Sequence, residues 1–106
     1  MKFRGGMSEL MRQASRLQRK VATRKDELKA ETVEASAGND QVKVVINGAH
    51  ELVSIQIDPE LLEQEELGMV QDLIIAAVNA GMTKSTEMVE AEIEKVTGGM
   101  SIPGLV

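Results

Sequence analysis

The sequence predicts an α+β fold in which an N-terminal helix, a three-stranded antiparallel sheet and a long C-terminal helix follow one another. Apolar residues recur every three or four positions over residues 7–29 and over about 67–96, which is typical of amphipathic helices. Between these segments apolar and polar residues alternate, as they do in half-buried strands. The 106 residues are the size of one domain, so we treat 1–106 as a single unit.

The first helix is predicted over residues 7–29, with Ser8 as an acceptable N-cap. Residues 1–6 are expected to form a flexible basic arm, and residues 99–106 a loose tail. Arg24 interrupts the apolar stripe, because it stands where the periodicity predicts an apolar residue. The stripe consists of Met7, Leu10, Ala14, Leu17, Val21 and Leu28.

Three strands are predicted next, over residues 31–36, 41–46 and 51–57, with a turn by composition at 37–40. Asn47-Gly48 indicates a hairpin, usually with a two-residue turn. We favour a four-residue loop, 47–50, because this register pairs Val42 with Ile55 and Val44 with Val53. The two-residue register would place Val44 opposite Glu51. In both registers one face carries Val42, Val44, Ile46, Val53, Ile55 and Ile57.

Asp58-Pro59-Glu60 predicts a helix start, with Asp as N-cap and Pro at the first helical position. Leu61 and Leu62 are expected to pack back onto the sheet, and Gly68 is a candidate break. A long helix then continues to about Val96 and stops at Gly98-Gly99. Its length, about 30 residues or ~45 Å, exceeds what a three-stranded sheet covers. We therefore expect a symmetric homodimer.

Charge is distributed unevenly along the chain, whose formal net charge is −5. Residues 1–30 carry nine basic and three acidic residues, a net charge of +6, whereas residues 31–106 carry three and fourteen, a net charge of −11. Such an asymmetry predicts a polyanionic partner for the basic part. We expect the acidic remainder to repel DNA and so to restrict docking to one surface.

Four cations of the first helix, at spacings i, i+4, i+7 and i+8, share one face over ~12 Å. Cations that neutralise phosphates release counterions from double-stranded DNA. Phosphate contacts do not read bases, so we expect weak sequence preference. The alternative is that these cations form an ordinary solvated face. Such faces usually mix both signs of charge, whereas no acid lies between Met11 and Lys25. For Arg24, a second alternative is an ion pair with a carboxylate of the partner subunit. The candidate DNA-binding residues are Arg12, Arg16, Arg19, Lys20, Arg24 and Lys25; whether Lys2 and Arg4 contact DNA stays open.

Other classes of function find little support in the sequence. The chain has no cysteine, no apolar run near the roughly 20 residues of a membrane span, and no secretory signal, so we expect a cytoplasmic protein without a membrane partner. His50 falls in a predicted turn, and Asp58 is a cap. No nucleotide-binding loop, nucleophile elbow or metal-binding motif occurs. We expect neither enzymatic activity, cofactor, metal nor small-molecule substrate; the single aromatic residue, Phe3, disfavours single-strand binding.

Over nearly its whole length the chain resembles the YbaB/EbfC family of bacterial nucleoid-associated proteins. The resemblance rests on Gly5-Gly6-Met7, Leu10-Met11-Arg12-Gln13-Ala14, Val42 to Gly48, Ile55-Gln56-Ile57-Asp58-Pro59 with Leu61-Leu62, Asp72 to Asn79 followed by Lys84, and Gly99-Met100 to Pro103-Gly104. It implies a tweezer-like homodimer in the nucleoid whose projecting helices bind DNA. Ala80-Gly81 departs from the pattern and puts a glycine inside the long helix. The alternative function is a protein-interaction module whose basic helix docks on an acidic protein partner.

Overall fold

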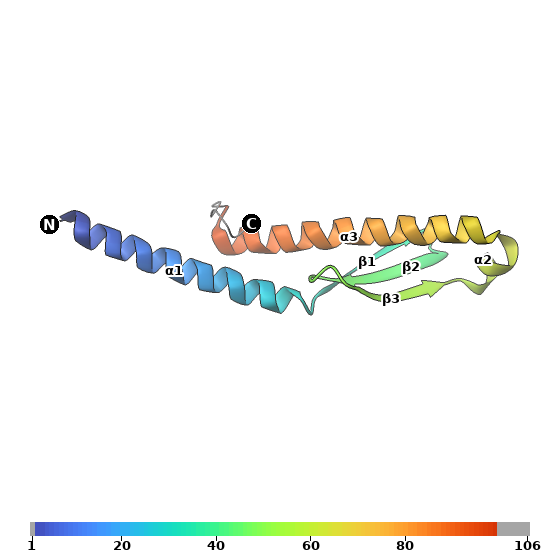
Figure 1. Ribbon diagram of the computed structural model, residues 1–106, viewed down its shortest axis with the longest axis horizontal. Helices are drawn as coiled ribbons and strands as arrows, with labels where there is room; N and C mark the ends of the chain where they lie inside the picture. Colours follow the sequence, from blue (N-terminus) through green and yellow to red (C-terminus); the bar gives the residue numbers. More distant parts are fainter. Residues whose placement is uncertain (1, 100–106) are drawn as a thin grey trace.

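The computed structural model describes residues 2–99, which form three helices and three strands (Figure 1). Helix α1 spans Lys2–Leu28. Strands β1 (Thr32–Ala37), β2 (Val42–Asn47) and β3 (Leu52–Ile57) follow. The short helix α2 (Pro59–Gln64) leads into the long helix α3 (Leu67–Thr97). This order confirms the predicted α+β fold class. Residues 100–106 of the predicted tail lie outside the described residues.

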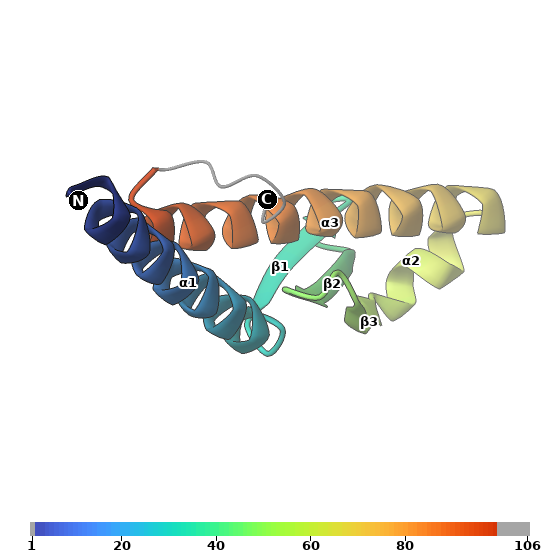
Figure 2. The same cartoon turned by 60° about the vertical axis from the view of Figure 1, so that its left-hand side comes forward.

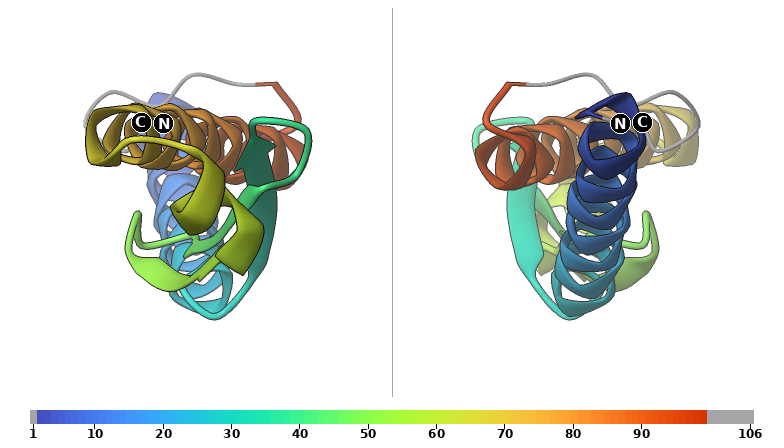
Figure 3. Two further views of the ribbon diagram at one scale, coloured as in Figure 1. Left: turned by 90° about the vertical axis from the view of Figure 1, so that its right-hand side faces the viewer. Right: turned by 90° about the vertical axis from the view of Figure 1, so that its left-hand side faces the viewer.

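The molecule is strongly elongated, with extents of 77 × 18 × 16 Å. Its radius of gyration is 20.4 Å, compared with about 13 Å for a compact domain of this length. Seen along the long axis, α3 lies above the sheet (Figure 3). Helix α1 crosses α3 near the C-terminal end of α3 and extends past that end, away from the sheet (Figures 1 and 2). The fold therefore has a sheet-containing body and a projecting helix.

The body is held together by α3, which packs across β1 and β2. Apolar residues of both strands, of α2 and of α3 form one buried cluster: Ala35, Val42, Val44, Ile46, Leu61, Val70 and Ala77. Gly81 lets the helix approach the sheet closely, because a Cβ at this position would lie 2.5 Å from Ile46 Cδ1 and 3.1 Å from Val44 Cγ2. The glycine inside the long helix, which departs from the family pattern, thus has a packing role.

The predicted hairpin between β2 and β3 is correct, but both considered registers are wrong. Val42 pairs with Ile57 and Val44 with Ile55, and a β-bulge leaves Val53 without a partner residue on β2. The loop is shorter than expected because Asn47 and Glu51 already bond to each other: Asn47 N donates to Glu51 O at 3.1 Å. His50 takes up the left-handed conformation, with φ 60°, which is typical of three-residue hairpin loops.

The helix start at Asp58 follows the prediction. Asp58 Oδ1 accepts a hydrogen bond from Glu60 N at 3.0 Å, and Pro59 occupies the first turn. Leu61 is buried as expected, whereas Leu62 is 57% exposed, because adjacent helical residues point in different directions. The break between α2 and α3 falls at residues 65–66, and Gly68 lies inside α3. Gly98, with φ 64°, ends α3 as predicted.

A second apolar cluster joins α1 to α3. It consists of Val21, Leu28 and Ile93, with Met88, Val89 and Val96 packed against it. Helix α1 begins at Lys2, earlier than predicted, so residues 2–6 are helical and Ser8 lies within the helix. Gly5 and Gly6 lower helix stability by about 1 kcal/mol each but do not end the helix.

Candidate nucleic-acid interface

The N-terminal half of α1 leaves all its described side chains open to solvent. Every residue from 6 to 16 is exposed, including the apolar Met7 (62%), Leu10 (66%) and Met11 (68%). The apolar stripe therefore serves as core only from Leu17 onward, where α3 runs alongside. Both the charged and the apolar face of this half are free to meet another molecule.

Four cations form a ridge on the exposed part of α1, which we call the cationic ridge. It consists of Arg12, Arg16, Arg19 and Lys20. Arg12 has one acidic neighbour, Glu9, with 3.5 Å between Nη2 and Oε2, and both side chains are more than half exposed. Within residues 2–99, Arg16, Arg19 and Lys20 form no ion pair. Their charge is thus available to an external anion.

Arg24 lies in a cluster of carboxylates and not on the open ridge. Its Nη1 lies 2.8 Å from Glu31 Oε2 and 3.6 Å from Glu27 Oε1, and its Nη2 lies 2.5 Å from Glu92 Oε1. Only 25% of its side chain is exposed, compared with 65% for Arg12. The hydrogen bond that Arg24 donates to Glu92 raises the pKa of Arg24, and the hydrogen bonds that Glu92 accepts from Lys95 and Arg24 lower the pKa of Glu92. The pair is therefore charged over a wide pH range.

Lys25 also lies off the ridge. It follows Arg16 by nine residues, which is two and a half helical turns, so the two side chains leave α1 on opposite sides. Of the six candidate residues, the structure thus brings four together on one face and places Arg24 and Lys25 elsewhere.

Lys95 of α3 adds a cation that the sequence analysis missed. A hollow of about 540 Å³ between the two helices is lined by Arg19, Lys20, Thr23, Arg24, Glu27, Lys95 and Val96. Lys95 bonds to Glu92 at 2.5 Å, and its side chain is 75% exposed. Because α1 and α3 meet only in the folded chain, no local pattern signals that Lys95 lies beside the ridge.

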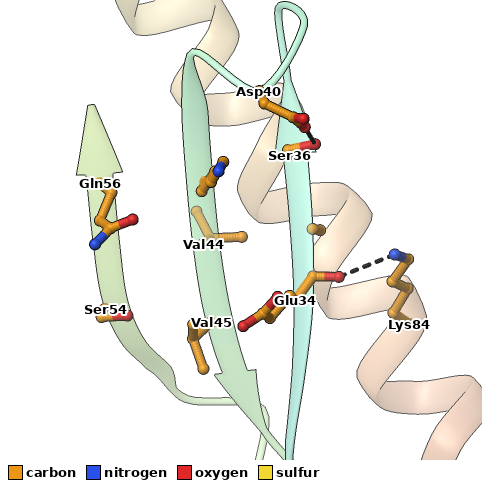
Figure 4. Close-up of a pocket in the computed structure, with 10 residues that line it drawn as sticks. Glu34, Ser36, Asp40, Val44, Val45, Ser54, Gln56 and Lys84 are labelled. Carbon is orange, nitrogen blue, oxygen red and sulfur yellow. Dashed lines mark hydrogen bonds between the residues drawn. The ribbon is translucent and has the colours of Figure 1, made fainter. Parts of the chain in front are cut away.

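Other clusters of polar residues in the described part of the chain have structural explanations. A trough of about 530 Å³ on the sheet is lined by polar side chains, among them Lys84, which donates from Nζ to Glu34 O at 2.9 Å, and Ser36, which donates to Asp40 at 2.7 Å (Figure 4). His50 Nε2 lies 2.8 Å from Thr86 Oγ1. Among residues 2–99 no group of three potential metal ligands occurs, and no helix there is long and apolar enough to span a membrane.

The fold and the ridge define a class of small, elongated α+β proteins with a projecting helix that carries exposed cations. The model of the YbaB/EbfC DNA-binding family matches residues 3–100, and the chain belongs to this family. It is 48% identical to a nucleoid-associated protein of Syntrophobacter fumaroxidans over 90% of this chain and 86% of the relative, and 47% identical to one of Acetivibrio thermocellus over 97% and 92%.

A solved structure has the same fold. The crystal structure of the uncharacterized protein HP0035 from Helicobacter pylori superposes with a TM-score of 0.71 at 25% sequence identity. The match covers 86% of this chain and 96% of that one. The arrangement of sheet and long helices is therefore shared with an experimentally determined structure.

Proposed function

We propose that the protein is a nucleoid-associated protein that binds double-stranded DNA as a homodimer, mainly through phosphate contacts from the cationic ridge and with weak sequence preference. The observation that carries the proposal is the ridge itself: four cations on one exposed helix face, three of them without an ion-paired carboxylate in the described part of the chain. The relatives named as nucleoid-associated proteins support the same partner.

Electrostatics favours DNA over an ordinary solvated surface for this ridge. Duplex DNA carries one negative charge per ~1.7 Å of axis, so cations spread over ~12 Å of helix meet several phosphates. Each phosphate that a cation neutralises releases counterions, which favours binding at low salt. The affinity therefore falls as salt is added, with a slope of about −0.9 per contact in a plot of log affinity against log salt concentration. The acidic body disfavours binding through any other face.

The homodimer is supported by strand β3, one side of which no part of the described chain covers. Helix α3 packs on β1 and β2 and leaves β3 open. Ile55 pairs with the buried Val44 but is itself 39% exposed. Leu52 (44%) and Val53 (56%) continue this apolar surface, and Leu62 (57%) lies in the adjoining helix. A second copy packed here would cover these residues and leave the two α1 helices projecting from the assembly.

The test is a salt titration of binding to a duplex of random sequence. In the double variant Arg16→Gln/Arg19→Gln we expect a lower affinity and a salt slope that is shallower by about 3.6 per dimer, since each of the two subunits loses two phosphate contacts. The control Lys29→Gln/Lys43→Gln removes two exposed cations away from the ridge and should leave the slope unchanged. Equal affinity and slope for the wild type and the ridge variant would refute the proposal.

A further inference from the structure

We propose that Arg24 and Glu92 form a clamp that fixes the angle between α1 and α3, so that Arg24 positions the cationic ridge for DNA instead of contacting phosphate itself. The inference deepens the proposed DNA binding and rests on it. It identifies Arg24 and Glu92 as positioning residues. Removing the negative charge of Glu92 is expected to weaken DNA binding, whereas simple electrostatics predicts that it strengthens DNA binding.

The clamp joins α1, α3 and the segment before β1 through one guanidinium group. Nη1 of Arg24 on α1 lies 2.8 Å from Glu31, which precedes β1, and Nη2 lies 2.5 Å from Glu92 on α3. Arg24 and Glu92 are 25% and 22% exposed, so both are partly shielded from solvent. A guanidinium is planar and presents its N–H groups in a fixed fork, so engaging two carboxylates with different nitrogens fixes its orientation. Helix α1 is thereby held in direction as well as in place.

The apolar contacts nearby do not supply this direction by themselves. The cluster of Val21, Leu28 and Ile93 buries apolar side chains between the helices, but packing of this kind leaves a scatter of about 15–20° in the crossing angle of two helices. Farther along α1, residues 6–16 are all exposed and provide no second point of support. The orientation of the ridge thus depends on the contacts at the base of the helix, among which the clamp is the most directional.

The length of α1 amplifies any change of angle at the clamp. Arg12 precedes Arg24 by twelve residues, which is ~18 Å along the helix axis, so a rotation of about 10° at Arg24 moves Arg12 by ~3 Å. This displacement equals the length of a hydrogen bond to a phosphate oxygen. A ridge whose far end wanders by this amount cannot keep all its phosphate contacts at once.

If Arg24 were instead a phosphate contact, removing Glu92 would release it, and Lys95 as well, toward DNA. Because the Glu92→Gln variant also gains one unit of positive charge, this hypothesis and simple electrostatics both predict tighter binding. The clamp predicts weaker binding from the same change. The sign of the effect therefore separates the two hypotheses.

The first measurement compares Glu92→Gln with Glu90→Gln in duplex DNA binding at one salt concentration. Glu90 lies on the same helix and is exposed, so its variant changes the charge equally without touching the clamp. We expect Glu90→Gln to bind as tightly as wild type or slightly tighter, and Glu92→Gln to bind about fivefold more weakly. Tighter binding by both variants would overturn the clamp.

The second measurement observes the helix angle without DNA. Because the chain contains no cysteine, spin labels can be attached at Ser15→Cys on α1 and Ala80→Cys on α3, both exposed. The clamp predicts a narrow distance distribution that broadens in Glu92→Gln and in Arg24→Lys, whose single ammonium cannot span both carboxylates, but not in Glu90→Gln. An unchanged distribution in both clamp variants would overturn the inference. Broadening in a protein that never binds DNA would uphold the clamp and refute the proposed function.

Discussion

A methyl group at Gly48 tests how tightly the β2–β3 loop is held against the base of α1. An ideal Cβ at this position would lie 2.0 Å from the carbonyl oxygen of Leu28 and 2.7 Å from its carbon, both of them backbone atoms. The loop cannot retreat freely, because Gly48 N donates to Glu31 O at 3.0 Å and the buried Ser85 Oγ donates to Asn47 O at 2.7 Å. Relief of the clash requires that these two hydrogen bonds lengthen or break.

We expect Gly48→Ala to lower the free energy of unfolding by about 2–4 kcal/mol. Each of the two hydrogen bonds contributes about 1 kcal/mol, and leaving the Ser85 hydroxyl unsatisfied adds a further penalty. The control is Gly68→Ala, where no atom lies within 4 Å of the added Cβ. Since Gly68 is helical, alanine should stabilise the protein there, by up to about 1 kcal/mol. Urea unfolding followed by circular dichroism, at one fixed protein concentration, measures both. The reasoning fails if the free energy of unfolding of Gly48→Ala lies within about 0.5 kcal/mol of the wild-type value.

Three further predictions concern α3, the clamp and β3. Gly81→Ala should destabilise by about 1 kcal/mol in the same urea assay, because overpacking against Ile46 outweighs the gain in helix propensity; a stabilised variant would contradict the tight packing. Because Lys95 and Arg24 lower the pKa of Glu92, this carboxyl stabilises the fold fully above its ordinary value of 4.5 and ever less as the pH falls through the lower, folded-state value. As the pH is lowered, the free energy of unfolding of the wild type should therefore fall more steeply than that of Glu92→Gln. Parallel curves of unfolding free energy against pH would contradict a stabilising role of the Glu92 carboxylate. Val53→Lys should shift the protein toward monomer in sedimentation equilibrium, since it places a charge on the open face of β3; an unaltered dimer would exclude this face as the interface.

Local signals in the sequence predicted the order of elements and most of their ends. Asp58-Pro59 marks a helix start and Gly98 a helix end through backbone and capping geometry that involves only neighbouring residues, so the sequence carries them directly. The alternation of Val42, Val44 and Ile46 was likewise sufficient to identify the buried face of β2. The register of β3 was not predictable in this way, because the bulge at Val53 depends on how the loop bonds to itself.

The candidate site was predicted less completely than the fold. Arg12, Arg16, Arg19 and Lys20 share a face because of helix geometry alone. The surroundings of Arg24 depend instead on Glu92, 68 positions away, and a list of charges along the chain shows no such neighbour. Sequence analysis identified Arg24 as exceptional, since it breaks the apolar stripe, and only the packing of α1 on α3 explains why.

The 77 Å length of the molecule, with positive charge at one end and acidic residues over the rest, makes it a large electric dipole. Screening limits each charge to a range of ~8 Å at physiological ionic strength, so near a duplex the two ends experience separate forces. In the proposed complex, the positive end would be attracted to the phosphates and the acidic end would be repelled by them. If the cationic ridge binds a duplex as proposed, the acidic body of the dimer would be held away from the phosphates and would stay accessible to other molecules.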